Sequence, residues 1–229
     1  MLSAKMEDYL KVVYELQRAE GAPVSTSAVA EALGVTAPTA TSALETLEES
    51  GFVEREKYAG ATLTPEGETV ALEVVRHHRL LETYLAEQLG YNWSEVHDEA
   101  DRLEHHISED FEARVAEVLG DPQVDPHGDP IPRTSLEPVE DPVGETLATH
   151  AVGDDLVVGQ VRDRDPDELA YLEDVGITPG TRLTLVEVAP IGMYTVALDD
   201  DSKVSLPESI AEAIRVRPAT AVVGAEEEP

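Results

Sequence analysis

The stretch from His97 to His105 carries the residue types most suited to chemistry, and it reads HDEADRLEH. It lies in a run that predicts a helix from about residue 94 to residue 119. Residues three and four apart on a helix share one face. The residues expected to project together on that face are His97, Asp101, Glu104 and His105. Two imidazoles and two carboxylates that converge in this way suit a divalent first-row metal ion.

A second pair of potential ligands, His78 and Glu82, is also spaced four apart and falls in the preceding predicted helix. His77 and His106 are adjacent in sequence to ligand candidates. Neighbouring helical residues point about 100° apart, so we interpret these two as neighbours and not as ligands. An acidic helix whose histidines are merely solvated is the alternative interpretation.

The composition is that of a globular chain without thiol chemistry. Its 229 residues are 41% hydrophobic, enough for the cores of roughly one to three small domains. No cysteine is present, which excludes disulfides, thiolate ligands and redox-sensing thiols. The sequence has no stretch apolar enough to span a membrane and no signal-peptide core, so we expect a cytoplasmic protein.

The net charge of -32 comes from 48 acidic residues against 16 Lys and Arg. Taken alone, that balance argues against a nucleic-acid partner. The acids are spread along the whole chain, however, as in proteins of halophiles, which function in molar salt where charges are screened within about 3 Å. We therefore take the charge to reflect the solvent. Disorder is the alternative, and the regular apolar periodicity argues against it.

The N-terminal residues, 1–64, predict a winged helix-turn-helix domain. Helices are expected at 3–18, 26–33 and 36–50, with a tight turn at Gly34-Val35 and a hairpin wing after them. The last of these helices is the candidate recognition helix, because no charged residue occurs from Ala32 to Leu44. Small hydroxyl side chains there can contact phosphates and base edges. A helix-turn-helix used only for packing is the alternative.

The remaining sequence completes an α+β fold class. Residues 65–120 predict an all-helical dimerisation and metal-binding domain, with a helix from Pro65 to about Leu89. A Pro-rich linker is expected at 121–145 and a small SH3-like β-barrel at 146–218. Its strands are predicted at 156–161, 182–188, 194–198 and 203–206, with a helix at 166–175. Residues 219–229 are expected to form a disordered tail.

Several motifs together resemble the diphtheria-toxin-repressor family of metal-dependent transcriptional repressors. They are Met6-Glu-Asp-Tyr-Leu, Val35-Thr-Ala-Pro-Thr-Ala-Thr-Ser, Leu63-Thr-Pro-Glu-Gly, His78-Arg-Leu-Leu-Glu, Val96-His-Asp-Glu-Ala-Asp-Arg-Leu-Glu-His and His127-Gly-Asp-Pro-Ile-Pro. The resemblance covers nearly the whole chain. It implies a homodimer that binds a palindromic DNA operator and represses metal-uptake genes when metal is bound.

The resemblance also implies particular site residues. Those that match the family's primary, activating metal site are Asp8, Asp101, Glu104 and His105. The ancillary site is matched by His78, Glu82 and His97, and two further ligands from the barrel by Asp165 and Glu168. The DNA contacts fall on Thr26, Ser27, Thr36, Pro38, Thr39, Thr41 and Ser42.

Two departures from the family pattern bear on the metal. Iron-type members have Met and Cys where this chain has Asp8 and Asp101, and hard carboxylates favour Mn(II) over softer metals. Manganese-type members have an acid where this chain has Lys11, so their closely spaced pair of ions does not follow from the resemblance. We expect Mn(II) and keep Fe(II) as the alternative.

Rival functions come from other classes. A His and carboxylate cluster can activate water in an enzyme, but no nucleophile or Gly-rich phosphate loop accompanies it. A metal buffer would have no use for the uncharged, hydroxyl-rich helix. An activator and a repressor remain equally compatible with the residues themselves.

Overall fold

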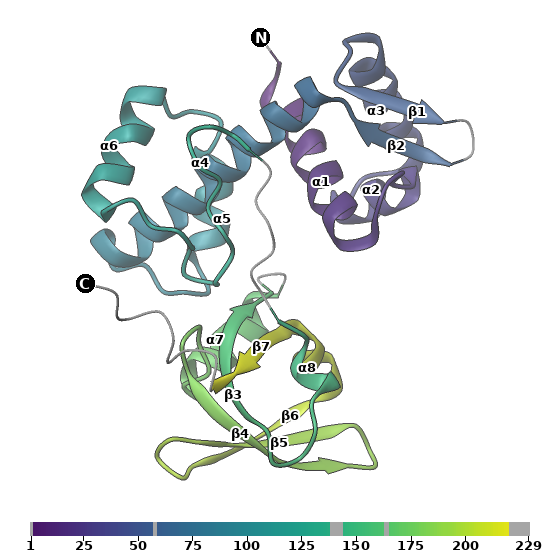
Figure 1. The fold of residues 1–229 in the computed structure, drawn as a ribbon. Helices are drawn as coiled ribbons and strands as arrows, with labels where there is room; N and C mark the ends of the chain where they lie inside the picture. The colour runs from purple at the N-terminus through teal and green to yellow at the C-terminus, as the bar shows by residue number, and fades with distance from the viewer. Residues whose placement is uncertain (1, 57–58, 138–143, 163–164, 220–229) are drawn as a thin grey trace, which may run out of the picture. The chain divides into compact units, whose positions relative to one another are not determined.

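The computed structural model describes residues 2–56, 59–137, 144–162 and 165–219 (Figure 1). This described part divides into two compact units. The first takes residues from 1–81, 100–121 and 131–139, and the second from 82–99, 122–130 and 140–229. None of the helices that the structure describes is long and apolar enough to cross a membrane.

The N-terminal part of the first unit is a winged helix-turn-helix, as predicted. It comprises α1 (Ala4–Glu20), α2 (Thr26–Ala32), α3 (Ala37–Glu49) and the antiparallel hairpin of β1 (Val53–Glu56) and β2 (Gly60–Leu63). Ser25 and Thr36 begin α2 and α3 by accepting hydrogen bonds from backbone amides three residues later. The apolar faces of α1 and α3 meet in a core that includes Tyr9, Leu10 and Leu44.

The central helices differ from the prediction at one important point. Helix α4 (Pro65–Leu89) has the expected bounds, but the single helix expected from residue 94 to residue 119 is wrong. The chain forms α5 (Val96–Leu103) and then α6 (Glu109–Leu119). Ser108 caps the start of α6, because its hydroxyl oxygen accepts a hydrogen bond from the Phe111 amide. Glu104 and His105 therefore lie in a turn and not on the helix face that carries His97.

The C-terminal residues of the second unit form the predicted small barrel. Among the described strands, five pair antiparallel in the order β6-β5-β4-β3-β7. Their bounds are β3 (Asp155–Val161), β4 (Arg182–Ala189), β5 (Met193–Leu198), β6 (Lys203–Pro207) and β7 (Ile214–Pro218). Helix α7 (Pro166–Asp174) was predicted, whereas the 3-10 turn η1 (Leu147–Thr149), α8 (Glu208–Ala213) and β7 were not. Most of the predicted tail, from residue 220, lies outside the described residues.

Gly67 provides a test of how α4 begins. A helical glycine usually destabilises its helix relative to alanine, but a Cβ at Gly67 would overlap the carbonyl oxygen of Phe52. We expect Gly67→Ala to lower the free energy of unfolding by about 1–3 kcal/mol, measured by urea denaturation. The exposed Thr69→Ala substitution in the same turn is the control and should change it little. A stabilised Gly67→Ala protein would contradict this packing.

Candidate metal centre

Potential metal ligands of the described residues gather in three groups, within each of which one donor atom per residue lies within 4.8 Å of the others. Two donors on opposite sides of one ion, each about 2.2 Å from it, would be about 4.4 Å apart. The spacing is therefore close to what a single ion requires. The groups are Asp8 with Glu104 and His105, His78 with His97 and Asp101, and Glu82 with Asp125 and His127.

The first group connects α1 to the turn that follows α5. His105 Nε2 lies 2.7 Å from Asp8 Oδ1 and 3.3 Å from Glu104 Oε1. Its other ring nitrogen, Nδ1, lies 2.8 Å from Glu7 Oε2. Three of the four residues predicted for the primary site thus come together, and Glu7 is an acidic neighbour that the sequence did not single out.

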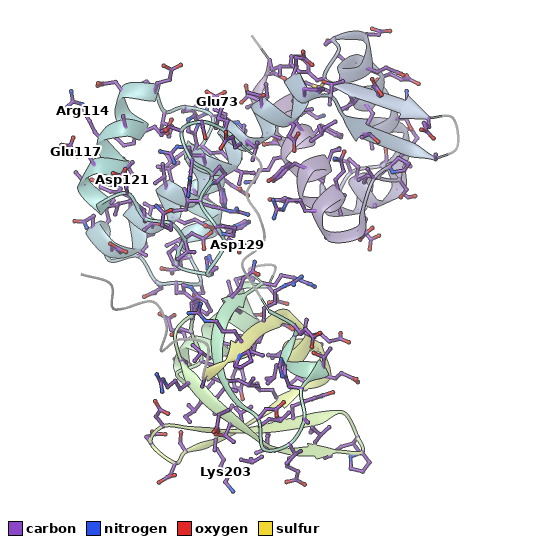
Figure 2. The ribbon with its side chains drawn as sticks, viewed as in Figure 1. Glu73, Arg114, Glu117, Asp121, Asp129 and Lys203 are labelled. Atoms are coloured by element: carbon purple, nitrogen blue, oxygen red, sulfur yellow. The ribbon has the colours of Figure 1, made fainter. Side chains whose placement is uncertain are left out.

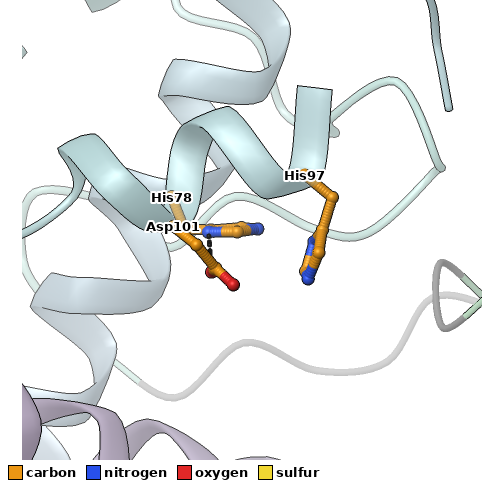
Figure 3. A group of neighbouring side chains, drawn as sticks. All are labelled: His78, His97 and Asp101. Carbon is orange, nitrogen blue, oxygen red and sulfur yellow. Dashed lines mark ion pairs between the residues drawn. The ribbon is translucent and has the colours of Figure 1, made fainter. Parts of the chain in front are cut away.

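The fourth predicted residue of that site, Asp101, belongs to the second group. Figure 3 shows Asp101 of α5 beside His78 of α4, with Oδ1 and Nδ1 3.2 Å apart, and His97 one turn earlier on α5. His78 Nδ1 also lies 2.5 Å from Glu104 Oε2. Glu104 consequently presents one carboxylate oxygen to each of these two groups.

A lysine that was not expected there lies among these ligands. Lys11 Nζ is 2.8 Å from Glu104 Oε2, 3.0 Å from Asp101 Oδ1 and 3.0 Å from His78 Nδ1. Burial alone would lower the pKa of Lys11, but the neighbouring carboxylates, that of Glu104 foremost, raise it above its usual value. Burial likewise raises the pKa of Glu104, but the contacts with His78 and Lys11 outweigh it and hold that pKa below its usual value. Both side chains are therefore charged at neutral pH.

The third group lies within the second unit, and its three residues are buried. His127 Nδ1 is 3.7 Å from Glu82 Oε2, and His97 Nδ1 is 3.2 Å from Glu82 Oε1. Asp125 Oδ1 accepts hydrogen bonds of 2.9 Å from the backbone amides of His127 and Asp129. Figure 2 shows Asp129 on this loop. Sequence reasoning missed Asp125 and His127 as ligands because the whole segment reads as a Pro-rich linker, although His127 opens one of the family motifs.

Residues 122–130, which carry Asp125 and His127, form a loop that we call the ligand loop. Hydrogen bonds from the barrel and from Trp93 hold this loop in place. The backbone amide of Val161 on β3 donates to the carbonyl of His127, and the Trp93 indole donates to the carbonyl of Pro126. Gly128 has φ +90 and lies so close to β3 that a Cβ there would overlap the Gly159 carbonyl oxygen. The barrel thus positions two potential ligands that are not part of it.

The barrel residues predicted as ligands are placed differently. Asp165 caps α7, because its carboxylate accepts hydrogen bonds from the amides of Asp167 and Glu168. Within the described ranges, neither Asp165 nor Glu168 belongs to any of the three groups.

The donor chemistry of the three groups fits a hard divalent cation. Each group offers carboxylate oxygen and imidazole nitrogen, and the chain has no cysteine. Such donors suit Mn(II) and Fe(II), whereas thiolates would favour softer ions.

Comparison with known proteins identifies the family. The model described as "Iron dependent repressor, N-terminal DNA binding domain" matches residues 1–61, and the one described as "Iron dependent repressor, metal binding and dimerisation domain" matches residues 64–133. A FeoA domain matches residues 145–218. The iron-dependent repressor IdeR of Mycobacterium tuberculosis is 34% identical over 228 residues, which cover 92% of this chain and 95% of that protein. The chain belongs to the iron-dependent repressor family.

Other members of the repressor family are similar over the same length. The diphtheria toxin repressor of Corynebacterium glutamicum is 30% identical, covering 92% of this chain and 94% of its own. A solved structure described as a manganese-dependent transcriptional repressor in complex with manganese is 41% identical, with a TM-score of 0.86 and coverage of 93% and 99%. The manganese regulator SloR is 31% identical, with a TM-score of 0.76 and coverage of 93% and 98%. The family consists of metal-dependent transcriptional repressors, which are not enzymes.

The predicted DNA-contacting residues of this repressor lie on α2, on α3 and at Thr36, the residue that caps α3. Thr36, Pro38 and Ser42 are exposed, and so is Ser27 on α2. The others, Thr26, Thr39 and Thr41, are partly exposed. The acids that follow on α3 are partly neutralised, because Arg55 on β1 lies 3.4 Å from Glu45 and 3.6 Å from Glu48.

Substitution of Gly128 tests whether the repressor's ligand loop depends on close contact with β3. We expect Gly128→Ala to destabilise the protein by about 1–3 kcal/mol and to weaken Mn(II) binding, as measured by thermal denaturation and calorimetry. Gly153→Ala is the matched control, because Gly153 has φ +100 but no atom near its Cβ position. Equal effects of the two substitutions would show that only backbone strain matters.

Proposed function

We propose that this protein is a Mn(II)-activated repressor of metal-uptake genes that acts as a homodimer on a palindromic operator in the cytoplasm. The observation that carries the proposal is the meeting of Asp8 on α1 with Glu104 and His105 in one ligand group. Helix α1 belongs to the helix-turn-helix and packs against α2 and α3. Ligation at this group therefore bears directly on the DNA-binding element.

The switch follows from the charges of the ligands. Asp8, Glu104 and Glu7 place three carboxyl groups around His105. A bound divalent cation would neutralise these carboxylates and favour the arrangement in which they converge. Asp8 is 42% exposed at its side chain, whereas Glu104 is buried. Asp8 is thus the most exposed carboxylate around His105, and its binding to the metal ion would set the position of α1 and of the recognition helix that packs with it.

The proposed DNA contacts use α3 and the start of α2. The exposed hydroxyl groups and the proline at the beginning of α3 can approach phosphates and base edges, and the helix N-terminus favours the phosphate charge. The pairing of Arg55 with Glu45 and Glu48 reduces repulsion from the acids on the last turns. The proposed contacts are Thr26, Ser27, Thr36, Pro38, Thr39, Thr41 and Ser42.

The proposed metal ligands extend the predicted set. Asp8, Glu104 and His105 form the activating group, and the other residues of the predicted set are His78, Glu82, His97 and Asp101. Asp125 and His127 are added because they are buried with Glu82. Asp165 and Glu168 remain a prediction from the family resemblance, and the Asp165 carboxylate is engaged in capping α7.

Fe(II) is the second candidate, because relatives such as IdeR are named iron-dependent repressors. The carboxylates of Asp8 and Asp101 favour Mn(II) by their hardness. We expect binding to DNA of its own promoter region, in molar KCl, to appear on titration with Mn(II) at a lower concentration than with anaerobic Fe(II). Fluorescence anisotropy measures both. Activation by Fe(II) at the lower concentration would favour an iron-dependent repressor.

Removal of single ligands tests the assignment of the switch. Asp101→Ala and His105→Ala are expected to reduce metal-dependent operator binding by at least about tenfold, while sedimentation still shows a folded dimer. The exposed neighbours provide matched controls, Asp98→Ala and His106→Ala, which should respond to metal like the wild type. Undiminished metal dependence in both ligand variants would refute these ligands.

A further inference from the structure

The ammonium group of Lys11 occupies a position that resembles a coordinated ion. Three polar atoms lie within hydrogen-bond distance of its Nζ: Glu104 Oε2 at 2.8 Å, Asp101 Oδ1 at 3.0 Å and His78 Nδ1 at 3.0 Å. A lysine has three N–H donors and no acceptor, so these contacts can use all of them. The lysine side chain is 11% exposed and that of Glu104 only 1%. This is a buried cation with a complete set of partners.

The two carboxylate oxygens of Glu104 face two different cation positions. Its Oε1 faces His105 at 3.3 Å and its Oε2 faces Lys11 at 2.8 Å. A carboxylate with one oxygen directed to each of two cation positions is arranged as a bridge. One position is the group of Asp8 and His105, and the other already holds the Lys11 ammonium.

His78 Nδ1 lies 3.0 Å from Lys11 Nζ and also 2.5 Å from Glu104 Oε2. With its proton on Nδ1 the His78 ring donates to Glu104, and with its proton on Nε2 it accepts from Lys11. In the second tautomer the Nδ1 lone pair points at the cation position, as it would toward a metal ion. Asp101 contributes a carboxylate oxygen to the same point. The three partners of Lys11 are therefore all of the kind that bind divalent ions.

We propose that Lys11 is a built-in cation that takes the place of a second metal ion, so that one divalent ion, not a pair, loads around Glu104. The proposal rests on the metal binding of the proposed function and specifies its stoichiometry. Lys11 also keeps Glu104 and Asp101 together before metal arrives, because it compensates one of their two negative charges. It is thus a specificity-determining residue that excludes an ion without binding one.

The test compares full-length wild type with Lys11→Met, which keeps the length of the side chain and removes its charge. We expect Lys11→Met to bind one more Mn(II) per chain than wild type at saturation, counted by elemental analysis after removal of unbound metal. Electron paramagnetic resonance should show a coupled Mn(II) pair only in the variant. Without metal, the variant should melt at a lower temperature than wild type.

Two further variants act as controls. Lys5→Met removes the same charge from an exposed position of α1, and Lys11→Arg keeps a cation at position 11; both should retain the wild-type stoichiometry. If Lys11→Met does not fold without metal, the number of bound Mn(II) ions per chain is measured for Lys11→Gln instead.

The outcomes separate the inference from the proposed function. Wild type that binds no Mn(II) would overturn the proposed function and this inference with it. Wild type that binds Mn(II), with no additional ion in Lys11→Met or Lys11→Gln, would overturn the role of Lys11 alone.

Discussion

The first unit depends on the compensation of one buried charge, the carboxylate of Glu104. Its two oxygens face different partners, His105 on one side and Lys11 with His78 on the other. A buried charge is costly unless it is compensated, so the loss of any one of these partners would lower the stability of the unit. α1, α4 and the turn after α5 are brought to one point by this requirement. The DNA-binding helices thereby share a polar core with the ligand groups.

The second unit satisfies a similar requirement in a different way. Glu82 is buried beside Asp125, His127 and His97, and the loop that supplies two of these is held by backbone hydrogen bonds. Rigid support of this kind raises the precision with which donor atoms are presented. In the first unit, charged side chains from helices and a turn gather around Glu104, whereas in the second unit a loop packed on a strand supplies Asp125 and His127.

The sequence predicted the elements well and the ligand groups less well. Helical periodicity and caps located α1 to α4, and family motifs supplied Asp8, Glu104 and His105. The prediction that His97 and His105 share one helix face was wrong, because the helix ends at Leu103. Helical spacing relates two residues only when both lie in the same helix. Asp125 and His127 were assigned to a linker because their burial comes from Trp93 and β3, which are distant in sequence. The partners of Lys11 are likewise long-range contacts that no local pattern reports.

Because the ligand loop is attached to β3, the boundary between the matched family domains differs from the boundary between the compact units of the structure. The family model for metal binding ends at residue 133, before the barrel begins. Yet residues 122–130 belong to the same compact unit as the barrel, and the amide of Val161 and the close approach of Gly159 hold them there. A fragment that ends at residue 133 would retain Asp125 and His127 but lose β3, the strand on which their loop packs. The barrel therefore supports, through β3, the loop that presents Asp125 and His127.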